Sequence, residues 1–542
     1  MMWMKCKCFR DPIYGYINIS EDIIYKIVDT AGFQRLRNII QTSYAPLYSS
    51  AVHNRFVHSL GVYHLGSIVS NYIYESKDDY NEITDIERIL EIFEIACLLH
   101  DLGHAPFSHT GEVYYLNDGK RDELHKEIFE LTNDVNLKDE IKLKNYSAAP
   151  HELMSAIVAL KDYSFLFNND DEKSFFARCI IGYPYVIDED VNGSFKNCVI
   201  SLLNSAVIDV DKLDYLIRDA YLTGFDTVSI DYERLLQSIK FRKDNDSYKV
   251  VYTKGAISVI ENVVYAHDAE RKWIQNHPVV QYESYLLQSV MRDLKNKYID
   301  KKLFSYEALT KEGIDIFPNY KISLLSDADI IFLMKNLNSE EVVEYYNRNK
   351  RRHPLWKSEA EYKAIFSAGF TDKTFAVVEN AIDGLTKYLN YLCKSCEIND
   401  KALDECIEDI KKTELECKGK NKKYMEAVVI EKKKHLVWLN VFNEFAADEG
   451  IDFNFIILKE NQFNSGFAKE AFGKIQIEFP SLKKLQYFKD VTNTLKADKS
   501  SREKFFYLFY KRKEEDKEKN INLRNLAYKM GKVAMKNIFD DN

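Results

Sequence analysis

The stretch Ala96–His109, "ACLLHDLGHAPFSH", places three histidines and an aspartate directly after an apolar run. His100 and Asp101 are adjacent at the end of that run, and Gly103, which follows closely, can end a helix. Adjacent side chains on a helix diverge by about 100 degrees, so both can reach one ion only near the end of the helix. We therefore predict that this pair binds a metal ion together with ligands from other helices.

Two further residues, His58 and Asp211, have surroundings that packing alone does not explain. His58 starts the apolar-periodic segment "HSLGVYHLGSIV", and Asp211 lies in "VIDVDKLDYLIRD". An unpaired aspartate buried among Leu and Ile costs several kcal/mol, which a cation offsets. Two imidazoles and two carboxylates suit Mn, Mg, Fe, Co or Zn and leave positions for water and phosphate oxygens. Each residue alone is more often structural, but the four together predict a catalytic site for a divalent metal ion.

The composition is typical of a soluble globular protein. With 542 residues the chain can form two or more lobes, and 46% of its residues are hydrophobic and 29% charged. The formal net charge of −9 makes nucleic acid an unexpected partner, although local basic clusters exist. No apolar run approaches the roughly 20 residues that cross a bilayer, so we expect no membrane span. The start "MMWMKCKCFRDP" lacks a secretory signal and the nine cysteines are irregularly spaced, which indicates a cytoplasmic protein.

Apolar residues recur at three- and four-residue spacing along most of the N-terminal half, which predicts that this half is all-helical. The clearest segments are "EDIIYKIVDTAGFQRLRNII", "HSLGVYHLGSIVSNYIYES", "DIERILEIFEIACLLHD", "HELMSAIVALKDY" and "SLLNSAVIDVDKLDYLIRDAYL". Strand patterns are few, at Ser247–Thr253 and Asp452–Lys459. The clustering of His and Asp stops and Lys density rises between about Ser339 and Lys363, so we place a domain boundary there.

Six motifs stand out: "DPIYGYINIS", "FQRLRNIIQTS", "HNRFVHSLGV", "LLHDLGHAPFSH", "HELMS" and "IDVDKLDYLIRD". They resemble motifs of the HD-domain phosphohydrolases, and among these the dNTP triphosphohydrolases, which include bacterial dGTPases and the vertebrate SAM-and-HD-domain dNTPase. The resemblance extends from about Asp11 to Trp356. It implies a mainly α fold, with an HD-type helical metal-binding core in residues 1–350 and a mostly helical lobe with minor β elements in residues 351–542.

The resemblance implies hydrolysis of a dNTP to deoxynucleoside and triphosphate, by attack of water on the α-phosphorus. It assigns the same four metal ligands, His58, His100, Asp101 and Asp211. It places His104 against a phosphate and makes His109 the acid that protonates the departing 5′-oxygen, which is a poor leaving group as an anion. His151 and Glu152 are further catalytic candidates.

The resemblance also assigns residues that hold the substrate. These are Gln41, Arg55, Lys212, Tyr215, Arg218, Asp219 and His277. Tyr215 would fill the place of a 2′-hydroxyl, and Gln41 and Asp219 would contact the 3′-hydroxyl. A simple ion pair between Arg218 and Asp219 is an equal alternative. The stretch "QTSYAPLYSSAVHNR" is one residue shorter than in the family and lacks the usual glycines, which puts selectivity for deoxyribose in question.

The stretch "DTAGFQRLR" resembles the part of the vertebrate enzyme that binds an activating guanine nucleotide at a subunit interface. This would map an allosteric role to Asp29, Gln34 and Arg37, and it would imply a homo-oligomer. The alternative is that this helix start only packs against its neighbours.

Two other functions remain open from the sequence. An HD phosphodiesterase or nuclease acting on cyclic nucleotides or single strands would use the same metal and release monophosphates. A nucleotide sensor with secondary catalysis would use the Lys-rich C-terminal region as its partner surface. The dNTPase is the favoured interpretation, because Arg55, Lys212 and Tyr215 suit a triphosphate and a single sugar; such an activity could serve antiviral defence by depleting dNTPs.

Overall fold

The computed structural model describes residues 5–43, 45–116, 120–144, 147–186, 191–225, 229–244, 247–298, 301–416, 422–459, 469–482, 484–496, 506–511 and 520–540. The chain forms two compact units. The first comprises Met1–Gln275, Glu283–Val342 and Asn464–Ala497, and the second comprises Asn276–Tyr282, Val343–Phe463 and Asp498–Asn542. The two units therefore interleave along the chain, and the roles expected for residues 1–350 and 351–542 stay predictions.

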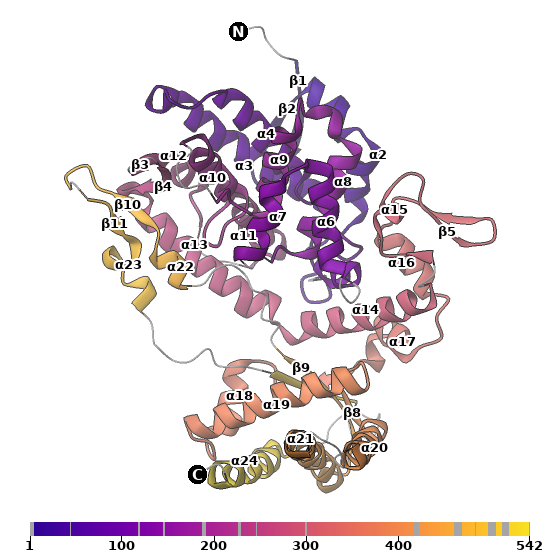
Figure 1. Ribbon diagram of the computed structural model, residues 1–542. Coiled ribbons are helices and arrows are strands. Elements are labelled where there is room, and N and C mark those ends of the chain that lie inside the picture. Colours follow the sequence, from indigo (N-terminus) through magenta and orange to yellow (C-terminus); the bar gives the residue numbers. More distant parts are fainter. Residues whose placement is uncertain are drawn as a thin grey trace. The chain divides into compact units, whose positions relative to one another are not determined.

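The first unit is mainly helical (Figure 1). Its helices up to the HD motif are α1 (Glu21–Ile23), α2 (Ala31–Arg35), α3 (Arg55–Glu75) and α4 (Ile86–Leu99). Those that follow are α5 (His109–Glu112), α6 (Lys120–Thr132), α7 (Val135–Lys144), α8 (Pro150–Asp162), α9 (Asp170–Ile181), α10 (Val191–Leu203), α11 (Val210–Thr223), α12 (Tyr232–Gln237) and α13 (Ile257–Glu270). Later segments add most of α14 (Pro278–Lys297), then α15 (Tyr306–Leu309), α16 (Asp327–Met334), α22 (Lys469–Gly473) and α23 (Phe488–Val491), and α17 (Glu340–Tyr346) crosses the boundary between the units.

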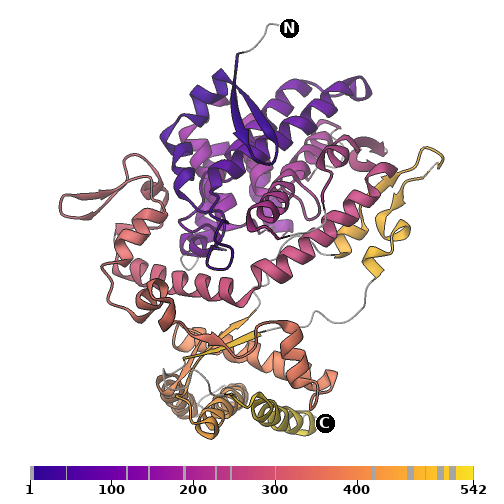
Figure 2. The ribbon, with the colours of Figure 1, turned by 180° about the vertical axis from the view of Figure 1, so that it is seen from behind.

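Three small sheets accompany these helices, so the prediction of an all-helical N-terminal half is wrong. Strands β1 (Cys6–Asp11) and β2 (Gly15–Ser20) form an antiparallel hairpin, with Cys6 opposite Ser20 (Figure 2). A second sheet has the order β11 (Gln486–Tyr487), β10 (Gln476–Glu478), β4 (Ser247–Thr253) and β3 (Ile239–Asp244), and β5 (Ile314–Phe317) pairs with β6 (Tyr320–Ile322). Strand β4 confirms the strand predicted at Ser247–Thr253. The hairpin was not predicted, because its buried apolar residues, Ile17 and Ile19, are too few to show strand alternation.

Two predicted helices are interrupted. The segment 21–40 breaks into α1, a π-helical turn (Ile24–Val28) and α2, because Thr30 adopts an extended backbone and its hydroxyl accepts the N–H of Phe33 as an N-cap. The segment 201–222 divides into α10 and α11, since Asp209 caps the second helix through a 2.8 Å bond from the backbone N–H of Lys212. The second break places the first turn of α11, which contains Asp211, beside His100 of the HD motif.

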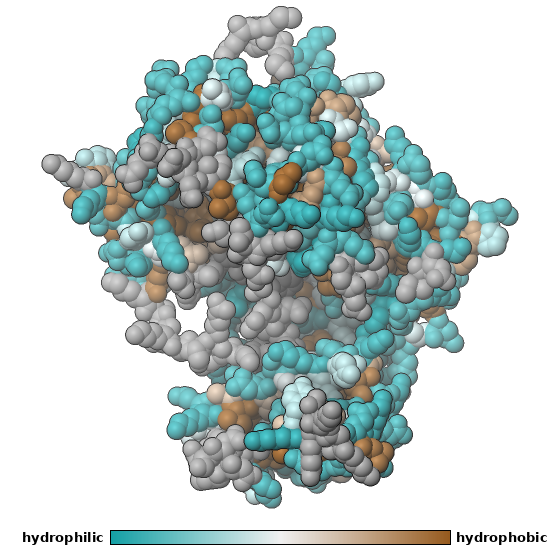
Figure 3. Space-filling model, viewed as in Figure 1, coloured by the Kyte–Doolittle hydropathy of each residue, from teal (hydrophilic) through white to brown (hydrophobic). Residues whose placement is uncertain are grey.

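The core of the first unit is built around α3, which packs against α4 and α11. Helix α3 begins after Asn54, whose side chain accepts the N–H of Val57 at 3.2 Å. Its apolar residues, such as Leu65 and Val69, are fully buried, as are Phe93 and Leu98 of α4. On the face drawn in Figure 3 hydrophilic residues cover most of the described surface. These helices form the rigid base of the histidine- and aspartate-rich site.

The second unit combines a four-stranded sheet with helices. The sheet has the order β7 (His353–Pro354), β12 (Phe506–Tyr510), β9 (Asn454–Lys459) and β8 (Glu397–Asn399), and the helices are α18 (Glu359–Phe366), α19 (Asp372–Leu392), α20 (Asp400–Glu416), α21 (Lys422–Glu449) and α24 (Leu523–Asp540). All residues of β12 are buried, and the Trp356 indole donates to the carbonyl of Phe506 at 2.8 Å. Strand β9 confirms the strand predicted near Asp452–Lys459.

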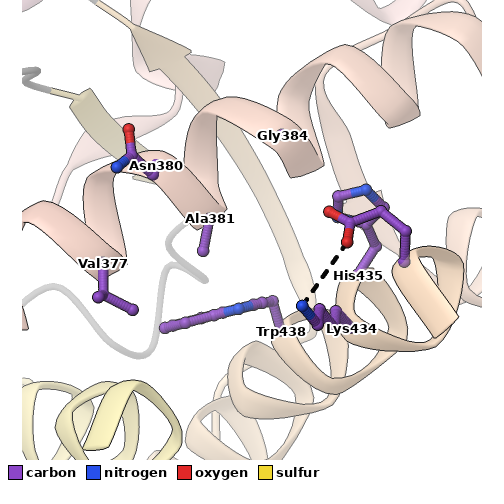
Figure 4. A pocket seen from close by; sticks show the side chains of 8 residues that line it. Val377, Asn380, Ala381, Gly384, Lys434, His435 and Trp438 are labelled. Atoms are coloured by element: carbon purple, nitrogen blue, oxygen red, sulfur yellow. Dashed lines mark ion pairs between the residues drawn. The ribbon is translucent and has the colours of Figure 1, made fainter. Parts of the chain in front are cut away.

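A cavity of about 290 Å³ lies between α19 and α21 in this second unit (Figure 4). Its lining residues are Val377, Asn380, Ala381, Gly384, Glu431, Lys434, His435 and Trp438. In the part of the chain that the structure describes, no helix is long and apolar enough to cross a membrane.

Candidate metal centre and its histidine cluster

The four predicted metal ligands come together at one point in the first unit. His58 Nε2 lies 2.9 Å from Asp211 Oδ1 and 3.3 Å from His100 Nε2. His100 Nε2 is 3.4 Å from Asp101 Oδ1 and 3.6 Å from Asp211 Oδ1. Asp211 is the most accessible ligand, with 35% of its side chain exposed, whereas the other three are buried. One side of the cluster is therefore open to solvent.

The hydrogen bonds at the far side of each imidazole show that these residues fit a divalent ion. His58 Nδ1 donates to Asp214 Oδ2 at 2.8 Å, and His100 Nδ1 donates to the carbonyl of Cys97 at 2.9 Å. With Nδ1 bonded on the outer side, the Nε2 atom of each ring faces the shared centre, next to two carboxylates. Metal-binding histidines use this arrangement, so the donor set and its orientation both suit a metal ion.

The local structure explains how three helices supply these ligands. Helix α4 ends at Leu99, so His100 and Asp101 lie at its C-terminal end as predicted. Asp211 lies in the first turn of α11, and His58 lies in the first turn of α3. Gly61, one turn after His58, allows α11 to approach closely, because a Cβ atom there would lie 1.9 Å from Asp214 Oδ1.

A network of buried charges holds Asp214 in place behind His58. Arg218 Nε donates to Asp214 Oδ2 at 2.8 Å, and Arg218 Nη1 donates to Asp11 Oδ2 at 2.9 Å. The Tyr14 hydroxyl adds a 2.8 Å bond to Asp214 Oδ1. Asp11 and Tyr14 belong to the hairpin β1–β2 and its turn, so the N-terminal hairpin supports a metal ligand from outside the helical core. Arg218 thus contacts protein carboxylates, and its predicted contact with substrate stays a prediction.

Arg55 links the metal ligands to the neighbouring loops. Its guanidinium donates to Asp101 Oδ2 at 2.8 Å, to Ser108 Oγ at 2.9 Å and to the carbonyl of Gln41 at 3.2 Å. Burial raises the pKa of Asp101, but Arg55 and the adjacent histidines His100 and His104 hold it well below its usual range. Arg55 therefore keeps Asp101 ionised as a ligand.

A second cluster, which we call the histidine cluster, consists of His104, His109, His151 and Glu112. The rings of His104 and His151 stack with centroids 4.2 Å apart, and His109 meets both edge-on. Glu112 accepts a hydrogen bond from His151 Nδ1, and its other oxygen lies 3.2 Å from His109 Nδ1. His104 joins the two clusters, because its Nε2 is 3.2 Å from Asp101 Oδ1.

Charges within the histidine cluster shift the ionisation of its members. Burial alone would lower the pKa of His151, but the Glu112 carboxylate raises it to about 9. Burial would raise the pKa of Glu112, but His151 and His109 hold it well below its usual range. His104 is buried beside Arg55, and its pKa is lowered well below 6.5. At neutral pH the cluster therefore combines a charged His151–Glu112 pair with a neutral His104.

Glu152 contacts different groups from those expected of a catalytic residue. One oxygen accepts the backbone N–H of Ala149 at 2.5 Å, which caps the start of α8, and the other accepts the side-chain amide of Asn204 at 2.8 Å. Glu152 lines a cavity of about 20 Å³ with His100, His151 and Asp211. A catalytic role for Glu152 stays a prediction, and its bonds attach the start of α8 to Asn204.

The predicted substrate contacts lie on several sides of the metal centre. Lys212 donates to Asp209 Oδ2 at 2.5 Å and to the carbonyl of Ser205 at 2.9 Å. Asp219 accepts a hydrogen bond from His53 Nε2 at 2.7 Å.

Gln41 and Tyr215 are the remaining predicted substrate-binding residues in the first unit. Gln41 is buried, and its Oε1 has no hydrogen-bond partner among the residues described. Burial raises the pKa of the Tyr215 hydroxyl well above its usual value, so this hydroxyl stays protonated. His277 belongs to the second compact unit, where its Nδ1 accepts the N–H of Val279 at 3.2 Å. All these substrate roles remain predictions.

The three residues assigned to an activating nucleotide contact one another and nearby groups. Gln34 Nε2 donates to the carbonyl of Val28 at 2.7 Å, and Arg37 donates to Gln34 Oε1 at 2.8 Å. The Arg37 guanidinium lies 3.5 Å from the Phe56 ring centroid, and Asp29 is 3.8 Å from Lys7. These contacts do not require a ligand, and the allosteric role is untested.

Three groups that the structure places at the site were not assigned from the sequence: Asp214, the Asp11–Tyr14 turn and Asp327. Asp214 could have been found, because it lies three residues after Asp211 on the same face of α11. The other two depend on contacts between residues about 200 or more positions apart, for which the sequence contains no periodic signal.

Comparison with known proteins agrees with this geometry. Residues 55–158 match the HD domain. The uncharacterized protein YwfO of Bacillus subtilis is 27% identical over 303 residues, which are 55% of this chain and 58% of that protein. The deoxynucleoside triphosphate triphosphohydrolase SAMHD1 of Mus musculus is 32% identical over 274 residues, which are 47% of this chain and 37% of that protein. The chain spans about half the length of the curated relatives that it matches.

Solved structures share the fold. A hypothetical protein of Aquifex aeolicus aligns with a TM-score of 0.54 at 18% identity, over 96% of this chain and 100% of that one. A phosphohydrolase of Bacteroides thetaiotaomicron aligns with a TM-score of 0.52 at 19% identity, over 93% of this chain and 100% of that one. The chain therefore carries an HD domain in residues 55–158 and, over about half its length, is similar to the HD-domain dNTP triphosphohydrolases.

Proposed function

We propose that the chain is a metal-dependent phosphohydrolase that converts a dNTP and water into a deoxynucleoside and triphosphate. The observation that carries the proposal is the pairing of two clusters: four converging ligands with fixed imidazole orientation, and the histidine cluster joined to them through His104. The names of the SAMHD1 relatives support the choice of substrate.

His58, His100, Asp101 and Asp211 would hold the divalent ion. Such an ion supplies Lewis acidity, which lowers the pKa of water and offsets negative charge on phosphate oxygens. A donor set of two imidazoles and two carboxylates suits Mn, Mg, Fe, Co or Zn. The partly exposed Asp211 lies on the side of the site that is open to solvent.

The histidine cluster supplies the protein's own acid and phosphate contacts. His109 is partly exposed, and Glu112 faces its Nδ1; the proposal assigns to this histidine the transfer of a proton to the 5′-oxygen as it leaves. His151 is held cationic by Glu112 and can balance phosphate charge. His104, which is neutral because its pKa is lowered well below 6.5, lies between the two clusters, where the proposal places it against a phosphate.

The substrate contacts extend the same proposal. Arg55 and Lys212 would approach the triphosphate, and Tyr215, Gln41 and Asp219 would surround the sugar. Regulation by a guanine nucleotide at Asp29, Gln34 and Arg37, and the homo-oligomer that it implies, belong to the proposal as secondary parts.

The test incubates purified protein with Mn²⁺ or Mg²⁺ and each dNTP and rNTP, singly and in pairs, and separates nucleoside, nucleotide and polyphosphate products. We expect deoxynucleoside and intact triphosphate, abolished by Asp101→Ala and kept by Asp122→Ala, an exposed aspartate of α6. A requirement for a nucleotide mixture would reveal activation. Monophosphate products would contradict the proposal and favour a phosphodiesterase or nuclease.

A further inference from the structure

Asp327, the first residue of α16, reaches two loops of the site from outside the residues that match the HD domain. Its Oδ1 accepts the backbone N–H of Phe107 at 2.7 Å, and its Oδ2 accepts the backbone N–H of Ile40 at 2.8 Å. One carboxylate therefore binds the residue just before Gln41 and a residue two positions before His109. Bonds from backbone N–H groups to an ionised acceptor are stronger than neutral ones.

The loop before His109 needs such support. Phe107 and Ser108 have φ angles of 57° and 54°, a region that non-glycine residues adopt only where the surrounding structure holds them. The Ser108 hydroxyl donates to the carbonyl of Ile40, so the same two loops meet at a second point. The strained turn directs His109 toward His151 and persists because surrounding groups hold it.

A buried arginine fixes the segment that carries Asp327. Arg35 Nε donates to the carbonyl of Leu325 at 2.6 Å, and its Nη atoms donate to the carbonyls of Leu102 and His104, at 3.2 and 2.5 Å. Arg35 is 3% exposed, so the loss of these bonds would leave a buried charge. The segment that contains Leu325 and Asp327 is thus bonded to two loops. One is the Gln41 loop, which contains Ile40 and Gln41, and the other is the His109 loop, residues 100–108 between α4 and α5.

We propose that Asp327 is a positioning residue that holds the Gln41 loop and the His109 loop in one geometry, so that the sugar contact and the proton donor are presented together. The inference rests on the proposed function for the roles of Gln41 and His109. It adds a residue far along the chain to the machinery of the site.

The first test compares Asp327→Asn with Asp329→Asn. Asparagine at 327 keeps the shape of the side chain but presents an NH₂ group to one of the two backbone N–H donors. Asp329 is the matched control, because it lies on the same helix and, among the described residues, its carboxylate accepts from Ser326, through the backbone N–H and the hydroxyl, both at 2.8 Å. Hydrogen exchange measured by mass spectrometry should show about tenfold faster exchange in peptides that cover Ile40 and Phe107 in Asp327→Asn, and no change there in Asp329→Asn.

The second test measures whether the loss of the Asp327 bonds weakens acid catalysis by His109. Asp327→Asn should lower kcat on a dNTP by about 10–100-fold, a range typical of displaced acid catalysis. It should change turnover of p-nitrophenyl triphosphate less than about threefold, since p-nitrophenolate leaves without a proton. Metal affinity, measured by titration with Mn²⁺, should match that of the wild type.

Each outcome decides the inference. Unchanged exchange at Ile40 and Phe107 would overturn it, and so would equal losses on both substrates, which indicate a structural role only. If the wild-type protein releases no triphosphate, the proposed function fails, and the exchange experiment alone then decides whether Asp327 holds the two loops.

Discussion

The metal centre and the histidine cluster both place three or more potential ligand atoms within 4.8 Å of one another, yet their chemistry differs. The metal centre mixes two imidazoles with two carboxylates, and both imidazoles have Nδ1 bonded so that Nε2 faces the centre. The histidine cluster has three imidazoles and one carboxylate, and this carboxylate occupies the Nδ1 side of two of the rings. Proximity alone therefore does not identify a metal site; the orientation of each donor and its outer partner does.

This difference in chemistry suits the two clusters to different roles. In the metal centre the Nε2 atoms of both imidazoles face a space beside two carboxylates, a donor set that attracts a metal ion, whereas Glu112 lies on the Nδ1 side of His151 and raises the pKa of that histidine to about 9. Asp211 and Asp214 likewise raise the pKa of His58, to about 10. One cluster is suited to bind a metal ion, and the other is suited to bind phosphate and move a proton.

The largest expected effect comes from removing a ligand. Asp211→Ala should abolish high-affinity binding of Mn²⁺ and lower kcat/KM by at least about 10³-fold, because several kcal/mol of charge stabilisation are lost. Isothermal titration with Mn²⁺ and a product assay measure both quantities. Glu112→Ala should leave Mn²⁺ affinity unchanged within about threefold; a large loss there would place the ion in the histidine cluster instead.

Glu112→Gln should lower kcat by about 10²-fold with metal binding intact, since the neutral amide no longer orients His109 or charges His151. The pH dependence of kcat should change as well, because the pKa of His151 falls when its carboxylate partner is lost and burial dominates. A pH profile identical to that of the wild type would show that Glu112 has no part in proton transfer.

Asp214→Asn tests the outer partner of His58. It should weaken Mn²⁺ binding by about 10–100-fold, as is typical when a carboxylate behind a metal-binding histidine is lost. Asp219→Asn is the matched control on the same helix, because its partner is His53 and not a metal ligand. Equal effects of the two substitutions on Mn²⁺ affinity would argue against a specific role for Asp214.

The stability of the protein should depend on pH through His151. Its pKa in the folded state, about 9, lies above the ordinary value of 6.5, so its stabilising effect is complete below about pH 6.5 and is lost as the pH rises through 9. We expect the contribution of His151 to the free energy of unfolding to fall by ~3 kcal/mol across this range. Denaturant titrations at several pH values measure it, and Glu112→Gln should remove the part of the slope that comes from His151 and leave the part that comes from His58, whose pKa Asp211 and Asp214 raise to about 10. A slope equal to that of the wild type would contradict the contribution of His151.

The smallest effect is expected for Glu152→Gln. The amide retains the bond that caps α8, so stability should fall by about 1 kcal/mol or less and kcat by less than about threefold. A loss as large as that of Glu112→Gln would restore Glu152 as the catalytic carboxylate predicted from the sequence.

The two clusters also differ in how much the sequence revealed. The adjacent pair His100–Asp101 after an apolar run, together with the burial cost of Asp211, predicted four residues that the structure brings together. Glu152, a catalytic candidate from the sequence, follows His151 in the chain, and its two oxygens accept hydrogen bonds from Ala149 and Asn204. Glu112 reaches His151 across 39 residues, and neighbouring positions in a sequence do not show such contacts.

The accuracy of the fold prediction also depended on whether a feature is marked by many residues or by few. The long helices α3, α4 and α8 match their predicted segments, because many apolar positions repeat the helical period. The hairpin β1–β2 and the breaks at Thr30 and Asp209 depend on single capping side chains and short pairings. These short features carry Tyr14, Asp11 and the start of α11, and so they determine the support of the metal centre.

The most direct test of the central claim is a crystal of the protein soaked in Mn²⁺, with anomalous diffraction measured at the manganese edge. The account predicts one strong peak at bonding distance, about 2–2.3 Å, from the ligand atoms of His58, His100, Asp101 and Asp211, and none among His104, His109 and His151. A peak inside the histidine cluster, with none at Asp211, would contradict the division of work between the two clusters.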